Sequence, residues 1–120
     1  MAPPGKRILI VEDEFFIALV VEEALQSAGY VTVGPIATLS KAIVAADTAE
    51  FDAAVLDINL NGEMAYPVAE KLLARGKRLV FTTGYGLHDM PARFRSLPVV
   101  AKPFLANRLV DAISKILGAG

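Results

Sequence analysis

The sequence predicts an α/β fold in which helices cover both faces of a parallel sheet. Two observations predict it: short, continuous apolar runs recur along the chain, and longer stretches of helical periodicity separate them. The chain has 120 residues, a length typical of one domain, and its composition, 54% hydrophobic and 21% charged, is typical of a globular chain. We expect a flexible N-terminal segment over residues 1–6 and one domain over residues 7–118.

Five strands are expected where apolar runs end at polar or turn-forming residues. Their succession favours a doubly wound, flavodoxin-like sheet with strand order 2-1-3-4-5, a common order for such units. The expected strands span residues 8–11, 31–35, 53–56, 79–82 and 99–101.

Five helices are expected to connect and follow these strands. The first is marked by apolar residues at helical spacing and by Gly29, which stands where a C-terminal cap is expected. The third begins near Tyr66, has Pro67 in its first turn, and is ended by Gly76. The helices are expected at residues 17–28, 38–46, 66–75, 91–96 and 105–117.

Composition narrows the chemistry that the chain can carry out. It has no cysteine, which excludes disulfides and cysteine-ligated zinc, and its one histidine, His88, is more typical of a surface residue than of a ligand. Any metal must therefore be held mainly by oxygen. A net charge of −1 with scattered Lys and Arg argues against direct nucleic-acid binding. No signal-peptide pattern opens the chain, so we expect a cytoplasmic protein without a membrane partner.

Polar side chains stand directly after four of the five expected strands. Glu12 and Asp13 follow the first strand, and Asp57, Thr83 and Lys102 follow the third, fourth and fifth. The carboxyl ends of parallel strands meet at one edge, so these side chains should share a pocket. Two carboxylates about 4 Å apart repel by on the order of 4 kcal/mol at an effective dielectric constant near 20. A hard divalent cation, with Mg²⁺ as the natural candidate, would offset that repulsion, and Lys102 adds a second positive charge.

This combination of groups is suited to phosphoryl transfer, in which most of the catalysis is positioning and neutralisation of the phosphoryl oxygens. Asp57 is the best nucleophile because it ends a buried strand, whereas the adjacent Glu12 and Asp13 are better suited to holding metal. The expected product is an aspartyl phosphate. Each residue alone has a simpler explanation, such as a loop cap for Asp57, a helix cap for Thr83 or a solvated charge for Lys102. Only their joint placement favours function.

Four segments at the strand ends carry a family resemblance that covers nearly the whole chain. In this order they resemble receiver domains of response regulators from bacterial two-component systems, and the receiver domain is expected over residues 7–118. The resemblance implies that Asp57 accepts a phosphoryl group from a phosphohistidine of a sensor kinase or a histidine phosphotransfer protein. The segments span residues 8–14, 55–60, 81–85 and 100–104.

The resemblance also implies roles for the other residues of the site. Mg²⁺ would be held by Asp13, Asp57 and the backbone carbonyl of Asn59, with Glu12 acting through water. Thr83 and Lys102 would contact the phosphoryl group from opposite sides, Gly84 would leave room beside it, and the bond between Lys102 and Pro103 would be cis. Such a domain is not an enzyme beyond its own phosphorylation and slow dephosphorylation. Its output would pass to an unknown downstream protein, and whether it forms a homodimer is left open.

One position departs from the family pattern. Val99 stands three residues before Lys102, where many receivers carry an aromatic residue that turns inward on activation. Residues 81–86 look like a variant of a motif found in alphaproteobacterial single-domain receivers that lack this aromatic, so Phe81 or Tyr85 would replace it in the switch.

Three other functions are weighed against this one. A phosphatase of the dehalogenase type needs a second acid two positions after its nucleophile, where this chain has Asn59. A flavin-binding module of the same fold would not place acids after its first strand. A degenerate receiver acting only as an interaction module is disfavoured by the intact set of site residues. On the first helix, Phe15 and Leu19 lie on the expected outer side, where kinase docking and accidental exposure are about equally favoured.

Overall fold

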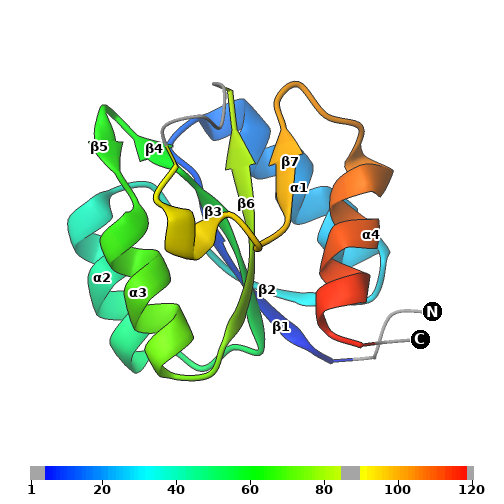
Figure 1. Ribbon diagram of the computed structural model, residues 1–120. Helices are drawn as coiled ribbons and strands as arrows, with labels where there is room; N and C mark the ends of the chain where they lie inside the picture. The colour runs from blue at the N-terminus through cyan, green and yellow to red at the C-terminus, as the bar shows by residue number, and fades with distance from the viewer. Residues whose placement is uncertain (1–4, 85–89, 119–120) are drawn as a thin grey trace.

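A five-stranded parallel sheet forms the centre of the computed structural model, which describes residues 5–84 and 90–118 (Figure 1). The strand order β2-β1-β3-β6-β7 corresponds to the predicted order 2-1-3-4-5, and all four pairings are parallel. The five predicted strands are therefore confirmed. Their bounds are β1 (Arg7–Val11), β2 (Val31–Ile36), β3 (Ala53–Asp57), β6 (Arg78–Thr83) and β7 (Val99–Ala101).

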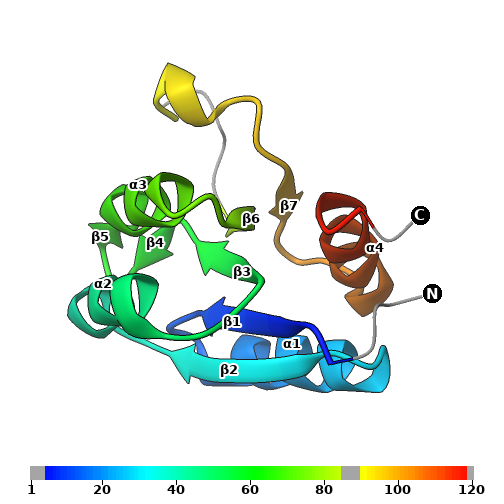
Figure 2. The same ribbon diagram turned by 90° about the horizontal axis from the view of Figure 1, so that it is seen from below.

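Helices cover both faces of the sheet (Figure 2). α1 (Phe15–Ser27) and α4 (Ala106–Ile116) lie on one face, and α2 (Leu39–Thr48) and α3 (Tyr66–Ala74) lie on the other. Among the residues described, no helix combines the length and the apolar composition needed to cross a membrane.

The strands divide their side chains between two apolar clusters, one under each pair of helices. In β1, Leu9 and Val11 face α2 and α3, whereas Ile8 and Ile10 face α1 and α4. All four of these side chains are completely buried. Because both faces are covered, the strands are apolar almost throughout, and polar side chains appear where the strands end.

The connection between β6 and β7 corrects the prediction of a helix over residues 91–96. In the part of this connection that is described, only a short 3-10 turn, η1 (Ala92–Phe94), is present, so the described residues contain four α-helices rather than five. Two prolines explain the difference. Pro91 and Pro98 leave too few residues between them for a stable helix, and Pro98 disfavours helical geometry at Leu97.

A short hairpin that was not predicted follows β3. It consists of β4 (Asn59–Leu60) and β5 (Glu63–Met64), paired antiparallel through a turn at Asn61 and Gly62. Both turn residues have positive φ, 55° and 88°. Asn-Gly is the pair that favours such a turn, because both residues adopt the left-handed conformation at low cost. The hairpin lies beyond the carboxyl end of β3, at the upper edge of the sheet in Figure 1.

Aromatic packing holds η1 against the sheet. Phe94 is fully buried, and its ring stacks on Tyr66 with centroids 5.3 Å apart and meets the edge of Phe81 at 5.9 Å. With so little regular structure in the described part of this connection, these ring contacts anchor it to α3 and β6.

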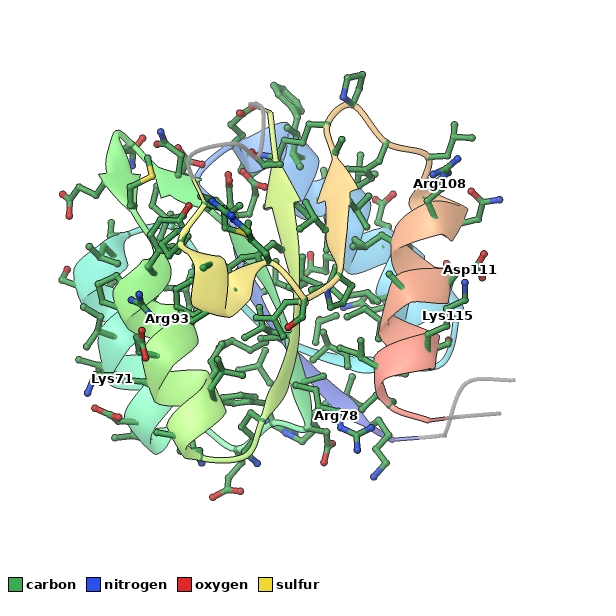
Figure 3. The ribbon with its side chains drawn as sticks, viewed as in Figure 1. Lys71, Arg78, Arg93, Arg108, Asp111 and Lys115 are labelled. Carbon is green, nitrogen blue, oxygen red and sulfur yellow. The ribbon has the colours of Figure 1, made fainter. Side chains whose placement is uncertain are left out.

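We therefore expect Phe94→Ala to lower the free energy of unfolding by about 3 kcal/mol, the usual cost of removing a buried aromatic ring. Urea denaturation measures this change. Arg93→Ala is the matched control: Arg93, labelled in Figure 3, is exposed, pairs with Glu70 on α3 and lies over the Phe94 ring, so its loss should cost only about 1 kcal/mol. Equal effects of the two substitutions would contradict the anchoring role of Phe94.

Candidate functional site

The acids that follow β1 and end β3 meet at the carboxyl edge of the sheet. Glu12, Asp13 and Asp57 each offer a carboxylate oxygen, and these oxygens all lie within 4.8 Å of one another. Glu12 and Asp57 are buried and Asp13 is partly buried. Residues far apart in the sequence are brought together because β1 and β3 are neighbours in the sheet and run in the same direction.

Lys102 lies against two of these acids. Its Nζ donates to Asp57 Oδ2 at 2.8 Å and to Glu12, whose nearer oxygen, Oε1, is 2.9 Å away. Glu14 is more distant, at 3.8 Å, and its side chain is exposed. The backbone N–H of Lys102 donates to the carbonyl of Thr83 at 2.7 Å, which fixes the end of β7 beside β6. The peptide bond between Lys102 and Pro103 is cis, as predicted.

Backbone N–H groups of the adjacent loops hold the carboxylates in place. Asp57 Oδ1 accepts from the N–H of Asn59, and Asp13 Oδ2 accepts from the N–H of Asn61, both at 3.1 Å. Asn59 Oδ1 in turn accepts from the N–H of Gly62 at 2.6 Å. The hairpin turn thus supports the site, and the sequence reasoning missed it although the Asn-Gly signal was present.

Two further predicted residues, Thr83 and Gly84, lie at the end of β6. Thr83 ends β6 and is buried, and Gly84 lines a pocket of about 400 Å³ together with Asp13, Asp57 and Lys102. Of the two alternatives for the switch aromatic, Phe81 is buried among the rings of Tyr66 and Phe94. Val99 is partly buried. Tyr85 and His88 lie outside the described residues.

Burial shapes the ionisation of the cluster. It raises the pKa of Glu12 to about 7, although hydrogen bonds from Lys102 and from the backbone of Glu14 oppose the shift. Burial likewise raises the pKa of Asp57 against the hydrogen bond from Lys102. For Lys102, burial favours the neutral form, but the contacts with Asp57 and Glu12 outweigh it and raise the pKa of the ammonium group. The cluster therefore favours additional positive charge, as a proton or as a cation.

The donor set fits a hard divalent cation. Three carboxylates supply only oxygen ligands, and one ammonium group neutralises only part of their charge. Burial raises the pKa of Glu12 and of Asp57, so both carboxylates are costly to keep charged without a cation beside them. Glu12, Asp13 and Asp57 could therefore hold a metal ion.

Comparison with known proteins agrees with this geometry. The chain matches the model of the response regulator receiver domain over residues 8–114. It is 38% identical to SdrG from Sphingomonas melonis Fr1, whose solution structure aligns with a TM-score of 0.83 over 97% of this chain and 99% of that one. It is 25% identical to the receiver domain of a sensor histidine kinase from Pseudomonas aeruginosa, which carries a magnesium ion in its active-site cleft (TM-score 0.79, 95% and 98% coverage).

A curated relative is PdtaR, a transcriptional regulatory protein of Mycobacterium tuberculosis. The two are 28% identical over 112 residues, which cover 90% of this chain and 55% of PdtaR. The chain thus spans about half the length of the curated relatives that it matches. The fold, the arrangement of the site and the family match together define the class: the chain belongs to the response regulator receiver family.

The raised pKa of Glu12 predicts how stability depends on pH. Between pH 4.5, the ordinary pKa of this group, and about 7, the folded protein holds a proton that the unfolded chain has lost. Unfolding then releases this proton, so without divalent cations the free energy of unfolding should fall as pH rises through that window. The raised pKa of Asp57 acts in the same direction.

Glu12→Gln should remove much of this slope, on the order of 2 kcal/mol between pH 5 and 7. Urea denaturation in EDTA at several pH values measures it. Glu23→Gln, on the exposed side of α1, is the matched control and should keep the wild-type slope. An unchanged slope in Glu12→Gln would contradict the assignment.

Proposed function

We propose that the chain is a phosphoryl-accepting receiver of a two-component relay, with Asp57 as its phosphoacceptor. The observation that carries the proposal is the position of the Asp57 carboxylate. It is buried at the end of a central strand, bonded to Lys102 and grouped with Glu12 and Asp13. A nucleophile for in-line attack must be held in one orientation, and this carboxylate is bonded on both oxygens.

The alternatives fit these contacts less well. A phosphatase of the dehalogenase type needs a proton donor two residues after the nucleophile, but Asn59 stands there and its side-chain oxygen is engaged with Gly62. A flavin phosphate would meet the acids that follow β1. Glu12 and Asp13 are less firmly placed, since they follow the end of β1 in the connection to α1, whereas Asp57 ends a strand that is paired on both sides.

For the metal, we propose Mg²⁺ held by Asp13, Asp57 and the backbone carbonyl of Asn59, with Glu12 acting through water. The all-oxygen donor set supports this choice, as does the magnesium ion in the cleft of the related kinase receiver domain. When bound, Mg²⁺ supplies positive charge to the phosphoryl oxygens.

The chain's own groups carry out the transfer. A carboxylate oxygen of Asp57 attacks the phosphorus, and the bond from phosphorus to the donor imidazole nitrogen breaks, with its electron pair returning to the ring. Lys102 neutralises the phosphoryl oxygens from one side, and the Thr83 hydroxyl donates to them from the other. Gly84 has no side chain to obstruct the incoming group.

The same contacts provide a switch. Negative charge on Asp57 attracts Thr83 and Lys102 toward it and so moves the ends of β6 and β7. Phe81 lies two residues before Thr83 in β6 and packs against Phe94. The movement therefore reaches η1 through a ring contact, without the aromatic residue that Val99 replaces, and a downstream protein reads the altered face.

The exposed apolar side of α1 fits a helix of the phosphodonor. Phe15 and Phe16 are 72% and 78% exposed, and Leu19 and Val20 are 39% and 46% exposed. Phe16 and Val20 line a groove of about 210 Å³ that also reaches Lys102. Because Lys102 lines both this groove and the acidic pocket, a helix seated in the groove would bring a phosphohistidine close to Asp57.

Phosphorylation with a small donor tests the function directly. We expect the wild-type protein, with Mg²⁺ and acetyl phosphate or phosphoramidate, to gain one phosphoryl group, because Asp57 needs no partner once the donor is in the pocket. Intact-mass spectrometry measures the adduct, which should be stable in acid and labile in base.

Asp57→Asn should abolish the adduct, since the amide is not a nucleophile, whereas Asp47→Asn, on the exposed side of α2, should not. No adduct in the wild type, either with small donors or with phosphorylated kinases, would instead favour a module that acts only by interaction.

A second experiment tests the docking side of α1. With any histidine kinase that phosphorylates the wild type, Phe16→Ala should slow transfer roughly tenfold, the size expected when an interface loses an aromatic anchor. Transfer from acetyl phosphate should stay unchanged because the acidic pocket is intact. Val44→Ala removes a comparably exposed apolar group on α2 and should leave both rates unchanged. Equal slowing by both substitutions would place the donor elsewhere.

A further inference from the structure

Thr82 carries an unusual hydroxyl group. Its side chain is buried, with 1% of its surface exposed, and among the described residues Thr82 Oγ1 is the one buried side-chain oxygen or nitrogen without a hydrogen-bond partner. Burying a hydroxyl without a partner is unfavourable, and a valine of the same shape would avoid the cost.

The sheet register places Thr82 in the same row as the phosphoacceptor. Thr82 pairs with Asp57 on one side and with Val100 on the other. Val80 and Val100 face the apolar cluster under α1 and α4, and side chains alternate along a strand, so Thr82 faces that side too. Its hydroxyl therefore lies one strand away from the Asp57 side chain.

Lys102 must pass this row to reach its partners. It follows β7, yet its ammonium group contacts Asp57 on β3 and Glu12 after β1. β6 lies between β7 and β3, so the lysine side chain, its hydrogen bond and the Asp57 side chain together bridge two strand spacings, on the order of 10 Å, across the end of β6. The side chain that faces it there, on the side of Val100, is Thr82.

A divalent cation and the ammonium group compete for the same carboxylate oxygens. Glu12 and Asp57 now bind Lys102, and both belong to the group of acids that could hold a metal. Two cations at one set of ligands repel, so binding of the metal favours retreat of the ammonium group toward β7. A partly buried ammonium group needs a new acceptor, and the hydroxyl of Thr82 lies along that path without a partner.

We propose that Thr82 is a positioning residue for Lys102. Its hydroxyl accepts a hydrogen bond from the ammonium group in the cation-bound form and so keeps Lys102 beside Asp57, facing the incoming phosphoryl group. The inference rests on the proposed function, because it assumes the divalent cation and the phosphoacceptor assigned above. In the cation-bound form, which is the form that reacts, the Thr82 hydroxyl would then have a hydrogen-bond partner.

Titration with Mg²⁺ alone, followed by amide resonances or calorimetry, tests the proposal. Thr82→Val should raise the dissociation constant of Mg²⁺ roughly tenfold, the effect of losing one hydrogen bond to a charged group. Thr82→Ser keeps the hydroxyl and should stay within about twofold of wild type. In metal-free protein, Thr82→Val should be at least as resistant to urea as wild type, because an unsatisfied polar group has been removed.

The Lys102→Met background separates positioning from packing. Without the ammonium group, Thr82→Val should change the dissociation constant by less than about twofold, since nothing remains for the hydroxyl to hold. A tenfold effect in this background as well, a Thr82→Ser variant as weak as Thr82→Val, or a Thr82→Val variant equal to wild type would each overturn the proposal. If the variants give any of these results while the wild-type protein still forms the aspartyl phosphate, only the role of Thr82 is refuted and the proposed function stands. Wild-type protein that binds no Mg²⁺ overturns both.

Discussion

The ammonium group of Lys102, held between Asp57 and Glu12, is the interaction on which the rest of the site depends. It joins the ends of three strands and partly neutralises carboxylates that would otherwise repel one another. The neutralisation is incomplete, because three carboxylates share one ammonium group, and burial makes the charge of Glu12 and Asp57 more costly. The sheet edge is thus assembled with a deficit of positive charge, and that deficit gives it affinity for a cation.

The sheet and its loops hold these carboxylates close together. Asp57 ends a strand that is paired on both sides and covered on both faces, so its backbone has little freedom to move away from its neighbours. The loops add directed N–H groups, from Asn59 to Asp57 and from Asn61 to Asp13. A rigid strand end combined with oriented backbone dipoles is a suitable setting for chemistry that relies on placement more than on acid-base catalysis.

Much of the fold was predictable because its signals are local. The strand before Asp57 is apolar throughout, and once the parallel order is known, the meeting of Asp13, Asp57 and Lys102 follows from topology. The predicted fourth helix was wrong because helical spacing over so few residues could not outweigh two flanking prolines. The hairpin turn at Asn61 was not predicted, although Asn61-Gly62 is a sequence signal for such a turn. The unsatisfied hydroxyl of Thr82 was not predictable, because it depends on the register of three strands and on how the neighbouring side chains pack.

The short 3-10 turn before β7 has a consequence for how the receiver can signal. Where a longer helix would have to move as a rigid body, the described part of this connection is held by bonds between residues three apart, such as Phe94 to Pro91 and Leu97 to Phe94, and is anchored by the ring of Phe94. Such a short segment buries fewer apolar contacts than a full helix, and segments with few buried contacts open locally at lower free-energy cost. In the proposed function, a charge added at the sheet edge would therefore act on a short segment held by one ring, rather than on a helix that must move as a unit.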